Sequence, residues 1–265
     1  MSKRNVKSLI CLTEESVETL YLLGKENLIK GVSCFIERPE QAKQLPIVTS
    51  FIKADVEKIK SIDPDLVIGF SDIQKDIAKQ LIAQGQEVYI SNQRSIKEIL
   101  DYIYRLSLMV DAKEDGLKLI TKLEKLIEQA QFKAKKFKYK PRIYFEEWDE
   151  PMINAIQWVS DIFEICGAEN IFHEKSQHSL AKDRYVKSSE VIERNPELIF
   201  ICWCGKKADL ESVKNRPGWD QIDAVKNNQI FELDPAIFLQ PGPAPIISGL
   251  NVILEKIQSS NIDKK

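Results

Sequence analysis

Four carboxylates gather in one strand-like segment of the chain, YFEEWDEP, at Glu146, Glu147, Asp149 and Glu150. Carboxylates at this spacing can support acid–base catalysis or bind a metal ion. Because successive side chains of a strand point to opposite faces, we expect only one or two of them to face a common site. The chain has no GxSxG elbow, no GxGxxG turn after a strand, no Walker A loop and no HExxH helix. We therefore expect no catalytic residue, and a binding protein in place of an enzyme.

The two histidines and a pair of cysteines are the other candidates for metal ligands. His173 and His178 lie with Glu174 in a polar segment, HEKSQHS, where exposed histidines are more common than metal ligands. Cys202 and Cys204 are separated by a single residue, whereas the cysteines of a zinc knuckle are further apart. We expect no metal site and no resident cofactor.

The composition of the 265-residue chain narrows its range of partners. The formal net charge is −2, and only one lysine-rich tract, KAKKFKYK, stands out, so we expect no nucleic-acid partner. No stretch approaches the ~18 apolar residues of a membrane span, so we expect no membrane insertion. The five cysteines match no disulfide framework, and at least four lie in apolar or strand-like contexts, which favours buried free thiols in a reducing compartment. We expect a monomer that binds a small molecule.

The N-terminal sequence MSKRNVKSLICLTEES contains no apolar segment as long as that of a signal peptide. As written, the chain is therefore expected to be cytoplasmic. An export signal already removed would place it in the periplasm or on the cell surface.

Two segments of the chain are repeated in the same order. Residues 20–29 (LYLLGKENLI) resemble residues 163–172 (FEICGAENIF), and in each a helix ends at a glycine suited to a left-handed cap. Residues 54–70 and 188–202 each predict a short helix stopped by a proline, followed by a continuous apolar strand, LVIGF or LIFIC. The repeat predicts an α/β fold of two Rossmann-like lobes, each with a mainly parallel sheet and flanking helices.

Between the two predicted lobes the pattern is helical and contains no strand. Apolar residues recur at helical spacing through residues 112–132, which predicts one continuous helix. Gly116 lies near the start of this helix, where we expect it to cost little. The expected domains are an N-terminal α/β lobe at 1–110, a connecting helix at 111–137 and a C-terminal α/β lobe at 138–265.

Open parallel sheets bind ligands beyond the carboxyl ends of their strands. The residues that follow the predicted strands are rich in aromatic rings, which suit a large, flat or amphipathic ligand. Charged side chains near these rings could hydrogen-bond the polar rim of such a ligand, whereas Trp158 and Trp219 are expected to be structural. The candidate ligand-binding residues are Glu14, Phe35, Phe51, Phe70, Arg94, Glu147, Trp148, Arg184, Tyr185, Trp203, Lys206, Phe238 and Gln240.

Several strings resemble one family over nearly the whole chain, among them DPDLVIGF, FEEWDEP, NPELIFICWCGKK, RPGWDQIDAV and FLQPGPAP. They resemble the helical-backbone solute-binding proteins of bacterial importers for cobalamin, siderophores and haem, and most closely the cobalamin-binding subgroup. The resemblance implies that aromatic residues of both lobes sandwich the corrin ring. Phe70 and the segment around Phe238 stand at the corresponding positions.

The resemblance also implies a glutamate on each lobe that docks on arginines of an ABC permease. In the first lobe Lys75 stands near the expected place, with Asp72 and Asp76 beside it, and in the second lobe DPAIFLQPGPAP contains no glutamate. The resemblance thus implies an ABC permease as partner, but the chain lacks the glutamates that would dock on the arginines of the permease.

We expect reversible binding of a bulky solute, cobalamin or another corrinoid, in a cleft between the two lobes. The chain would serve as the substrate-binding protein of an ABC importer or act as a cytosolic relative. One alternative is a siderophore or haem binder on the same scaffold. Another is a cytosolic corrinoid-handling enzyme or scaffold, because a fold alone does not fix a function.

Overall fold

The computed structural model describes residues 6–50 and 52–260 of the chain. The chain divides into two compact units. The first unit comprises the chain through Gln93 together with Lys97–Leu123, and the second comprises Arg94–Ile96 together with the chain from Glu124 onward. Within the two described ranges, we found no helix with the length and apolar character that crossing a bilayer requires.

The first unit is built on a six-stranded sheet with the order β4-β3-β2-β1-β5-β6. All neighbouring strands pair in parallel except β3 and β4, which are antiparallel. The strands are β1 (Leu9–Cys11), β2 (Ile29–Ser33), β3 (Ile47–Ser50), β4 (Lys53–Ala54), β5 (Leu66–Phe70) and β6 (Val88–Ser91). The apolar run LVIGF forms β5 as the sequence predicts, and β5 lies in the interior of the sheet with β1 and β6 on either side.

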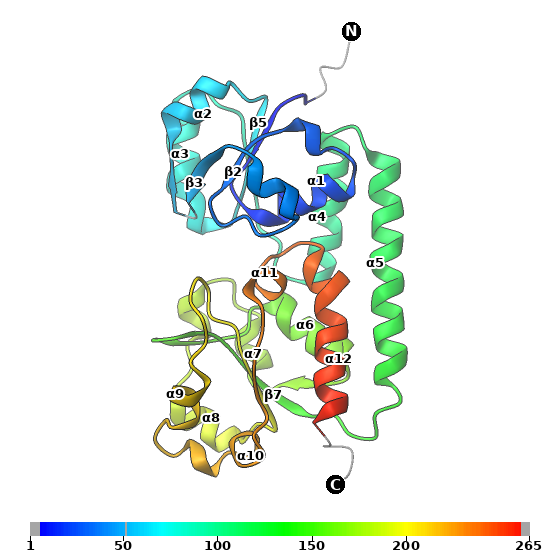
Figure 1. Ribbon diagram of the computed structural model, residues 1–265, viewed down its shortest axis with the longest axis vertical. Helices are drawn as coiled ribbons and strands as arrows, with labels where there is room; N and C mark the ends of the chain where they lie inside the picture. The colour runs from blue at the N-terminus through cyan, green and yellow to red at the C-terminus, as the bar shows by residue number, and fades with distance from the viewer. Residues whose placement is uncertain (1–5, 51, 261–265) are drawn as a thin grey trace. The chain divides into compact units, whose positions relative to one another are not determined.

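Helices cover both faces of this sheet (Figure 1). On one face, Ile59 of α2 and Leu81 of α3 pack against Ile10 of β1 in a buried apolar cluster. Because strand side chains alternate, Cys11 points to the opposite face, where the buried Tyr102 of α4 lies near it. The helices of this unit are α1 (Glu14–Leu22), α2 (Val56–Ile62), α3 (Lys75–Ala83) and α4 (Ile96–Met109), with short 3-10 turns η1 (Glu26–Leu28), η2 (Glu40–Gln44) and η3 (Asp72–Gln74).

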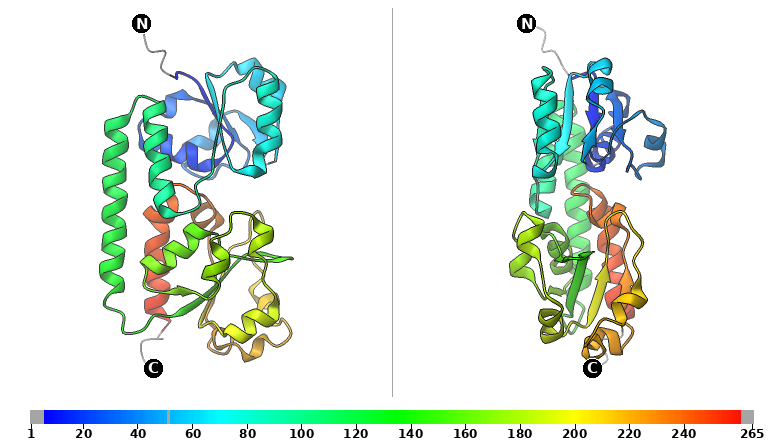
Figure 2. Two further views of the ribbon diagram at one scale, coloured as in Figure 1. Left: turned by 180° about the vertical axis from the view of Figure 1, so that it is seen from behind. Right: turned by 90° about the vertical axis from the view of Figure 1, so that its left-hand side faces the viewer.

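One uninterrupted helix, α5 (Lys113–Ala134), begins in the first unit and ends in the second. The continuous helix expected from the apolar stripe is thereby confirmed. Figure 2 shows α4 and α5 side by side, and a Cβ atom on Gly116 would stand 2.4 Å from the Cβ of Ser107. We expected Gly116 only to be tolerated in the helix, but the close approach of α4 and α5 requires a residue without a side chain at this position.

The second unit contains a five-stranded sheet in which β7 is central. Strands β11, β10, β7 and β8 follow one another, and the short β9 also pairs with β7. Only the pairing of β7 with β8 is antiparallel. The strands are β7 (Arg142–Asp149), β8 (Met152–Asn154), β9 (Glu169–Asn170), β10 (Leu198–Ile201) and β11 (Ile230–Glu232).

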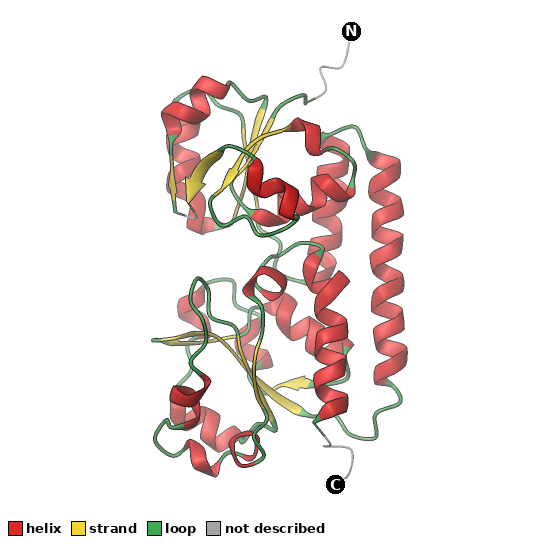
Figure 3. Ribbon diagram, in the orientation of Figure 1, coloured by secondary structure: helices red, strands yellow, loops and turns green. Residues whose placement is uncertain are grey.

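Most helices of the second unit are shorter than those of the first (Figure 3). Its apolar core includes Tyr144, whose ring meets the rings of Phe172 and Trp219 edge-on, with centroids 5.9 and 6.1 Å away. The helices are α6 (Gln157–Ile165), α7 (His173–Ser176), α8 (Ser188–Arg194), α9 (Leu210–Lys214), α10 (Asp223–Lys226), α11 (Pro235–Phe238) and α12 (Leu250–Ser259), with 3-10 turns η4 (Ala181–Arg184) and η5 (Trp219–Gln221) and a π-helical turn η6 (Pro245–Gly249).

Candidate functional site

Three strings that the sequence singled out meet at the carboxyl ends of β7 and β10. The two strands are parallel neighbours, with Ile201 opposite Glu146. The string EEWDEP forms the end of β7, and WCGKK follows β10 directly. The RPGW string reaches the same place through Arg216, which pairs with Glu146 across 70 residues of sequence. Residues far apart in the chain thus form one network within the second unit.

Glu146 is the centre of this network and is fully buried. Its Oε1 accepts hydrogen bonds from Trp203 Nε1 at 3.0 Å and from the Arg216 guanidinium at 2.8 Å. Its Oε2 accepts hydrogen bonds from the Tyr144 hydroxyl at 2.9 Å and from the Arg216 guanidinium at 2.6 Å. A buried carboxylate is stable only when it is paired and hydrogen-bonded, and both oxygens here meet that condition.

The charges of this network reinforce one another. Burial opposes the positive charge of Arg216, but the hydrogen bonds and the charge of Glu146 outweigh it and raise the pKa of Arg216. Burial, followed by the charge of Glu146, raises the pKa of the Tyr144 hydroxyl well above its usual value. Tyr144 therefore stays protonated and donates to Glu146, which holds the Trp203 indole in one orientation.

A lysine lies between two tryptophan rings at the same strand ends. The Nζ of Lys206 is 4.4 Å from the centroid of Trp148 and 4.6 Å from that of Trp203, both cation–π distances. The same Nζ is 2.7 Å from both carboxylate oxygens of Asp149. Burial opposes ionisation of Asp149, but the hydrogen bond from Lys206 prevails and lowers the pKa of that carboxyl. We call Trp148, Lys206 and Trp203 the tryptophan–lysine layer.

Glu147 lies outside this layer, in β7 between Glu146 and Trp148, where the register with β8 shifts. Its carboxylate pairs with Arg184, whose Nη1 donates to Glu147 Oε2 at 2.5 Å and to the Asn154 carbonyl oxygen at 2.6 Å. Arg184 is buried, and within the described part of the chain its Nε–H has no hydrogen-bond acceptor. The neighbouring Tyr185 is 44% exposed.

In the first unit, Glu14 and Glu15 occupy the first turn of α1, directly after β1, and both are buried. Thr13 donates to Glu15 Oε1 at 2.5 Å, but the Oε2 atoms of Glu14 and Glu15 have no hydrogen-bond partner among residues 6–50 and 52–260. Burial, and then the charge of Glu15, raises the pKa of Glu14 to about 8. Burial also raises the pKa of Glu15 to about 7, against the hydrogen bond from Thr13.

The remaining predicted ligand-binding residues lie in different surroundings. Phe35 follows β2 and is 52% exposed, whereas Phe70 ends β5 and is buried. Phe238 is fully buried, with its ring against the position where Gly249 would carry a Cβ, and its carbonyl accepts from Trp158 Nε1 at 2.8 Å. The others are Arg94, which is buried, Gln240, which is half-buried, and Phe51, which lies outside the described residues.

Trp158 and Trp219 are buried, as expected of structural residues. Sequence reasoning did not identify Glu146 and Arg216 as the centre of the site. The signal available was a glutamate inside the strand YFEEW, because a buried carboxylate requires a cationic partner somewhere in the chain. Within the second unit, the layer and the Glu147–Arg184 pair account for five of the predicted residues.

The candidate metal ligands are dispersed. Across the described ranges, no group of three or more histidine, cysteine, aspartate or glutamate side chains could hold a metal ion. His173 Nδ1 lies 2.8 Å from Glu164, a half-exposed surface pair. All five cysteines lie in the described part of the chain and none forms a disulfide, but only Cys11, Cys166 and Cys202 are buried. Cys34 and Cys204 are exposed, because they lie in the loops that follow β2 and β10, so the expectation of buried thiols was wrong for these two.

The matching family model is that of periplasmic binding proteins and extends over residues 9–237, so the chain belongs to this family of binding proteins, which are not catalytic. A vitamin B12-binding protein of Vibrio vulnificus is 27% identical over 92% of this chain and 87% of its own length. An uncharacterized ABC transporter substrate-binding lipoprotein of Bacillus subtilis is 25% identical over 96% of this chain and 81% of its own. The structure of a periplasmic heme-binding protein from Roseiflexus has a TM-score of 0.82 at 18% identity, covering 97% of this chain and 100% of the other, and shows the shared two-lobed α/β fold.

Proposed function

We propose that the chain reversibly binds a corrinoid, cobalamin or a relative of it, as the substrate-binding protein of an ABC importer. The observation that carries this proposal is the tryptophan–lysine layer at the carboxyl ends of β7 and β10. In open parallel sheets these ends are where ligands bind. The 27% identity to a vitamin B12-binding protein over nearly the whole chain supports the ligand class.

The layer suits a flat macrocycle for a physical reason. Trp148 is half-buried and its Nε1 donates to the Glu150 carbonyl oxygen at 2.9 Å, while Trp203 is buried and its Nε1 donates to Glu146. A ring held in one orientation before binding loses little side-chain entropy on contact with the ligand.

Trp148 is the better residue for a test, since replacing Trp203 also removes a hydrogen bond to the buried Glu146. Calorimetric titration with cyanocobalamin and with dicyanocobinamide should show saturable binding, accompanied by quenching of tryptophan emission. Trp148→Ala should weaken corrinoid binding by roughly 1–3 kcal/mol, the scale of one buried aromatic contact. Phe132→Ala, at an exposed aromatic of α5, is the matched control and should leave the affinity unchanged.

A well-folded chain that binds neither corrinoid would refute the proposal. Saturable binding of haemin in their place, with a Soret band in the visible spectrum, would transfer the site to haem. Equal loss of corrinoid affinity in Trp148→Ala and Phe132→Ala would remove the tryptophan–lysine layer from the binding site.

A further inference from the structure

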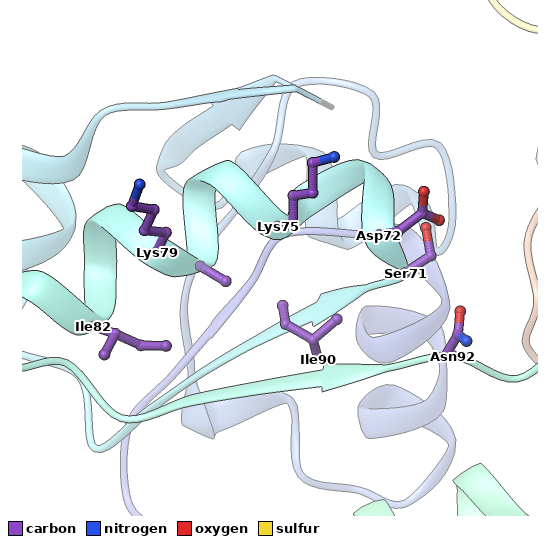
Figure 4. Close-up of a pocket in the computed structure, with 8 residues that line it drawn as sticks. Ser71, Asp72, Lys75, Lys79, Ile82, Ile90 and Asn92 are labelled. Atoms are coloured by element: carbon purple, nitrogen blue, oxygen red, sulfur yellow. The ribbon is translucent and has the colours of Figure 1, made fainter.

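A groove of about 600 Å³ lies within the first unit, between α3 and the edge strand β6 (Figure 4). Its floor is apolar and includes Ala78, Ile82 and Ile90. Figure 4 shows Ile90 pointing from β6 toward α3, and Ile82 is 61% exposed. The tryptophan–lysine layer lies in the other unit, so this groove forms no part of it.

Two lysines, Lys75 and Lys79, line the groove from successive turns of α3. Both are exposed, and neither makes an ion pair with a residue of the described chain. Lysines are often solvated singly, but two unpaired lysines one turn apart beside an apolar floor create a local positive potential. Among the described residues that line the groove, Asp72 is the one acidic side chain.

The second wall of the groove is the open edge of a sheet. Strand β6 is the last in the order β4-β3-β2-β1-β5-β6, and among the described strands it pairs only with β5. The amides of Val67 and Ser71 donate to the carbonyls of Glu87 and Ser91, so these alternate residues of the β6 segment face β5. Because strand hydrogen bonds to one neighbour use alternate residues, the peptide groups of Val88 and Ile90 face the open edge. An unpaired edge is a template for another strand.

We propose that this groove docks an extended, acidic segment of a partner protein, which adds to the sheet as a strand beside β6. Peptide groups of the segment pair with those of Val88 and Ile90, which supplies affinity independent of sequence. Its side chains on the α3 side place carboxylates near Lys75 and Lys79 and apolar groups on Ile82. A second copy of this chain fits less well, because it would bring further lysines to a surface that is already positive.

The test uses the whole chain and a short fluorescein-labelled peptide. Every second residue of this peptide, in chain order, is glutamate, glutamate, valine and valine. Fluorescence anisotropy should show saturable binding, weakened at least about ten-fold by Lys75→Glu together with Lys79→Glu. A peptide with lysine in place of its glutamates should bind this variant better than the wild type. The matched control is Lys122→Glu with Lys125→Glu, two exposed lysines of α5 outside the groove, which should change neither affinity.

Hydrogen exchange separates strand addition from simple charge attraction. Peptide binding should slow exchange of the Val88 and Ile90 amides, whereas the Tyr89 amide, which faces β5, should change little. No saturable binding of the acidic peptide, binding that ignores the lysine reversal, or unchanged exchange at Val88 and Ile90 would each overturn the proposal. Binding of octanoate in place of the peptide would assign the groove to a small amphipathic anion, and self-association through the same edge would assign it to a second copy.

Discussion

The two units treat buried carboxylates in opposite ways. In the second unit, Glu146 is fully buried and both its oxygens accept hydrogen bonds, two of them from the Arg216 guanidinium. In the first unit, Glu14 and Glu15 are buried in the first turn of α1, and each has an oxygen without a partner in the described chain. Burial alone therefore does not decide the charge state of a carboxyl, because the groups around it do.

The surroundings of Glu14 explain this difference. Its near charges are Glu15, Glu18 and Glu37, all of the same sign. The nearby cation Arg38 forms an ion pair with Glu18, and the distance from the Arg38 guanidinium to Glu18 Oε1 is 2.8 Å. Like charges and burial both favour the neutral acid, so the pKa of Glu14 rises to about 8. Carboxyls of the first unit thus respond to pH near neutrality, whereas Glu146 of the second unit is paired with the Arg216 guanidinium.

Removing the cation of the second unit should have the largest effect. Arg216→Met leaves Glu146 buried with only Tyr144 and Trp203 as donors, and should lower the free energy of unfolding by about 3–5 kcal/mol. Urea unfolding followed by circular dichroism measures this change. Lys214→Met, which breaks the exposed pair with Glu211, is the control and should cost less than about 0.5 kcal/mol. Similar losses in the two variants would show that Glu146 is not held by Arg216.

Changing pH should have an intermediate effect, confined to the first unit. The folded-state pKa values of Glu14 and Glu15 lie above the ordinary glutamate value of 4.5, so the folded chain binds more protons than the unfolded chain between pH 4.5 and about 8. Their stabilising contribution is complete below pH 4.5 and is lost as the pH rises to about 8.

Glu14→Gln removes this dependence at one of the two sites. Relative to the wild type, the variant should gain about 2–4 kcal/mol of unfolding free energy between pH 4.5 and pH 8.5, since one pKa unit corresponds to about 1.4 kcal/mol. Chemical unfolding of both proteins across this range measures the gain. A difference that stays constant with pH would mean that Glu14 titrates normally.

The smallest effect is expected where charges are partly exposed. Lys206→Met removes the pair with Asp149 and both cation–π contacts, but the Lys206 side chain is 40% exposed, so the unfolding free energy should fall by less than about 1 kcal/mol. Tryptophan emission should shift measurably even so, because Nζ lies over two indole rings. A loss as large as that of Arg216→Met would show that exposure does not govern these contributions.

Local sequence was sufficient to predict the repeated architecture of the two units. The helices before Pro64 and Pro196 end at Ile62 and Arg194, so one residue lies between each helix and its proline. Asp63 and Asn195 then adopt the left-handed conformation, with φ of 51° and 40°. Aspartate and asparagine tolerate that conformation better than most residues, so the residues next to each proline are enough to predict the turn.

The candidate site was only partly predictable, because its contacts join distant parts of the chain. Trp148, Trp203 and Lys206 could be proposed from their places after strands, yet the ion pair between Glu146 and Arg216 spans 70 residues. No local pattern distinguishes Arg216 from a solvated arginine. The pairing of Glu147 with Arg184 was equally hidden from local sequence, since the two residues are 37 positions apart.

The buried unpaired cysteines allow the unfolding of each unit to be followed separately. Cys11 lies in β1 of the first unit and Cys166 and Cys202 lie in the second, all three buried, whereas Cys34 and Cys204 are exposed. Burial raises the pKa of the Cys166 thiol to about 12, so a thiol-alkylating reagent reacts with it only when its surroundings open. Mass spectrometry of timed alkylation would therefore resolve, residue by residue, whether the two units unfold together or one before the other.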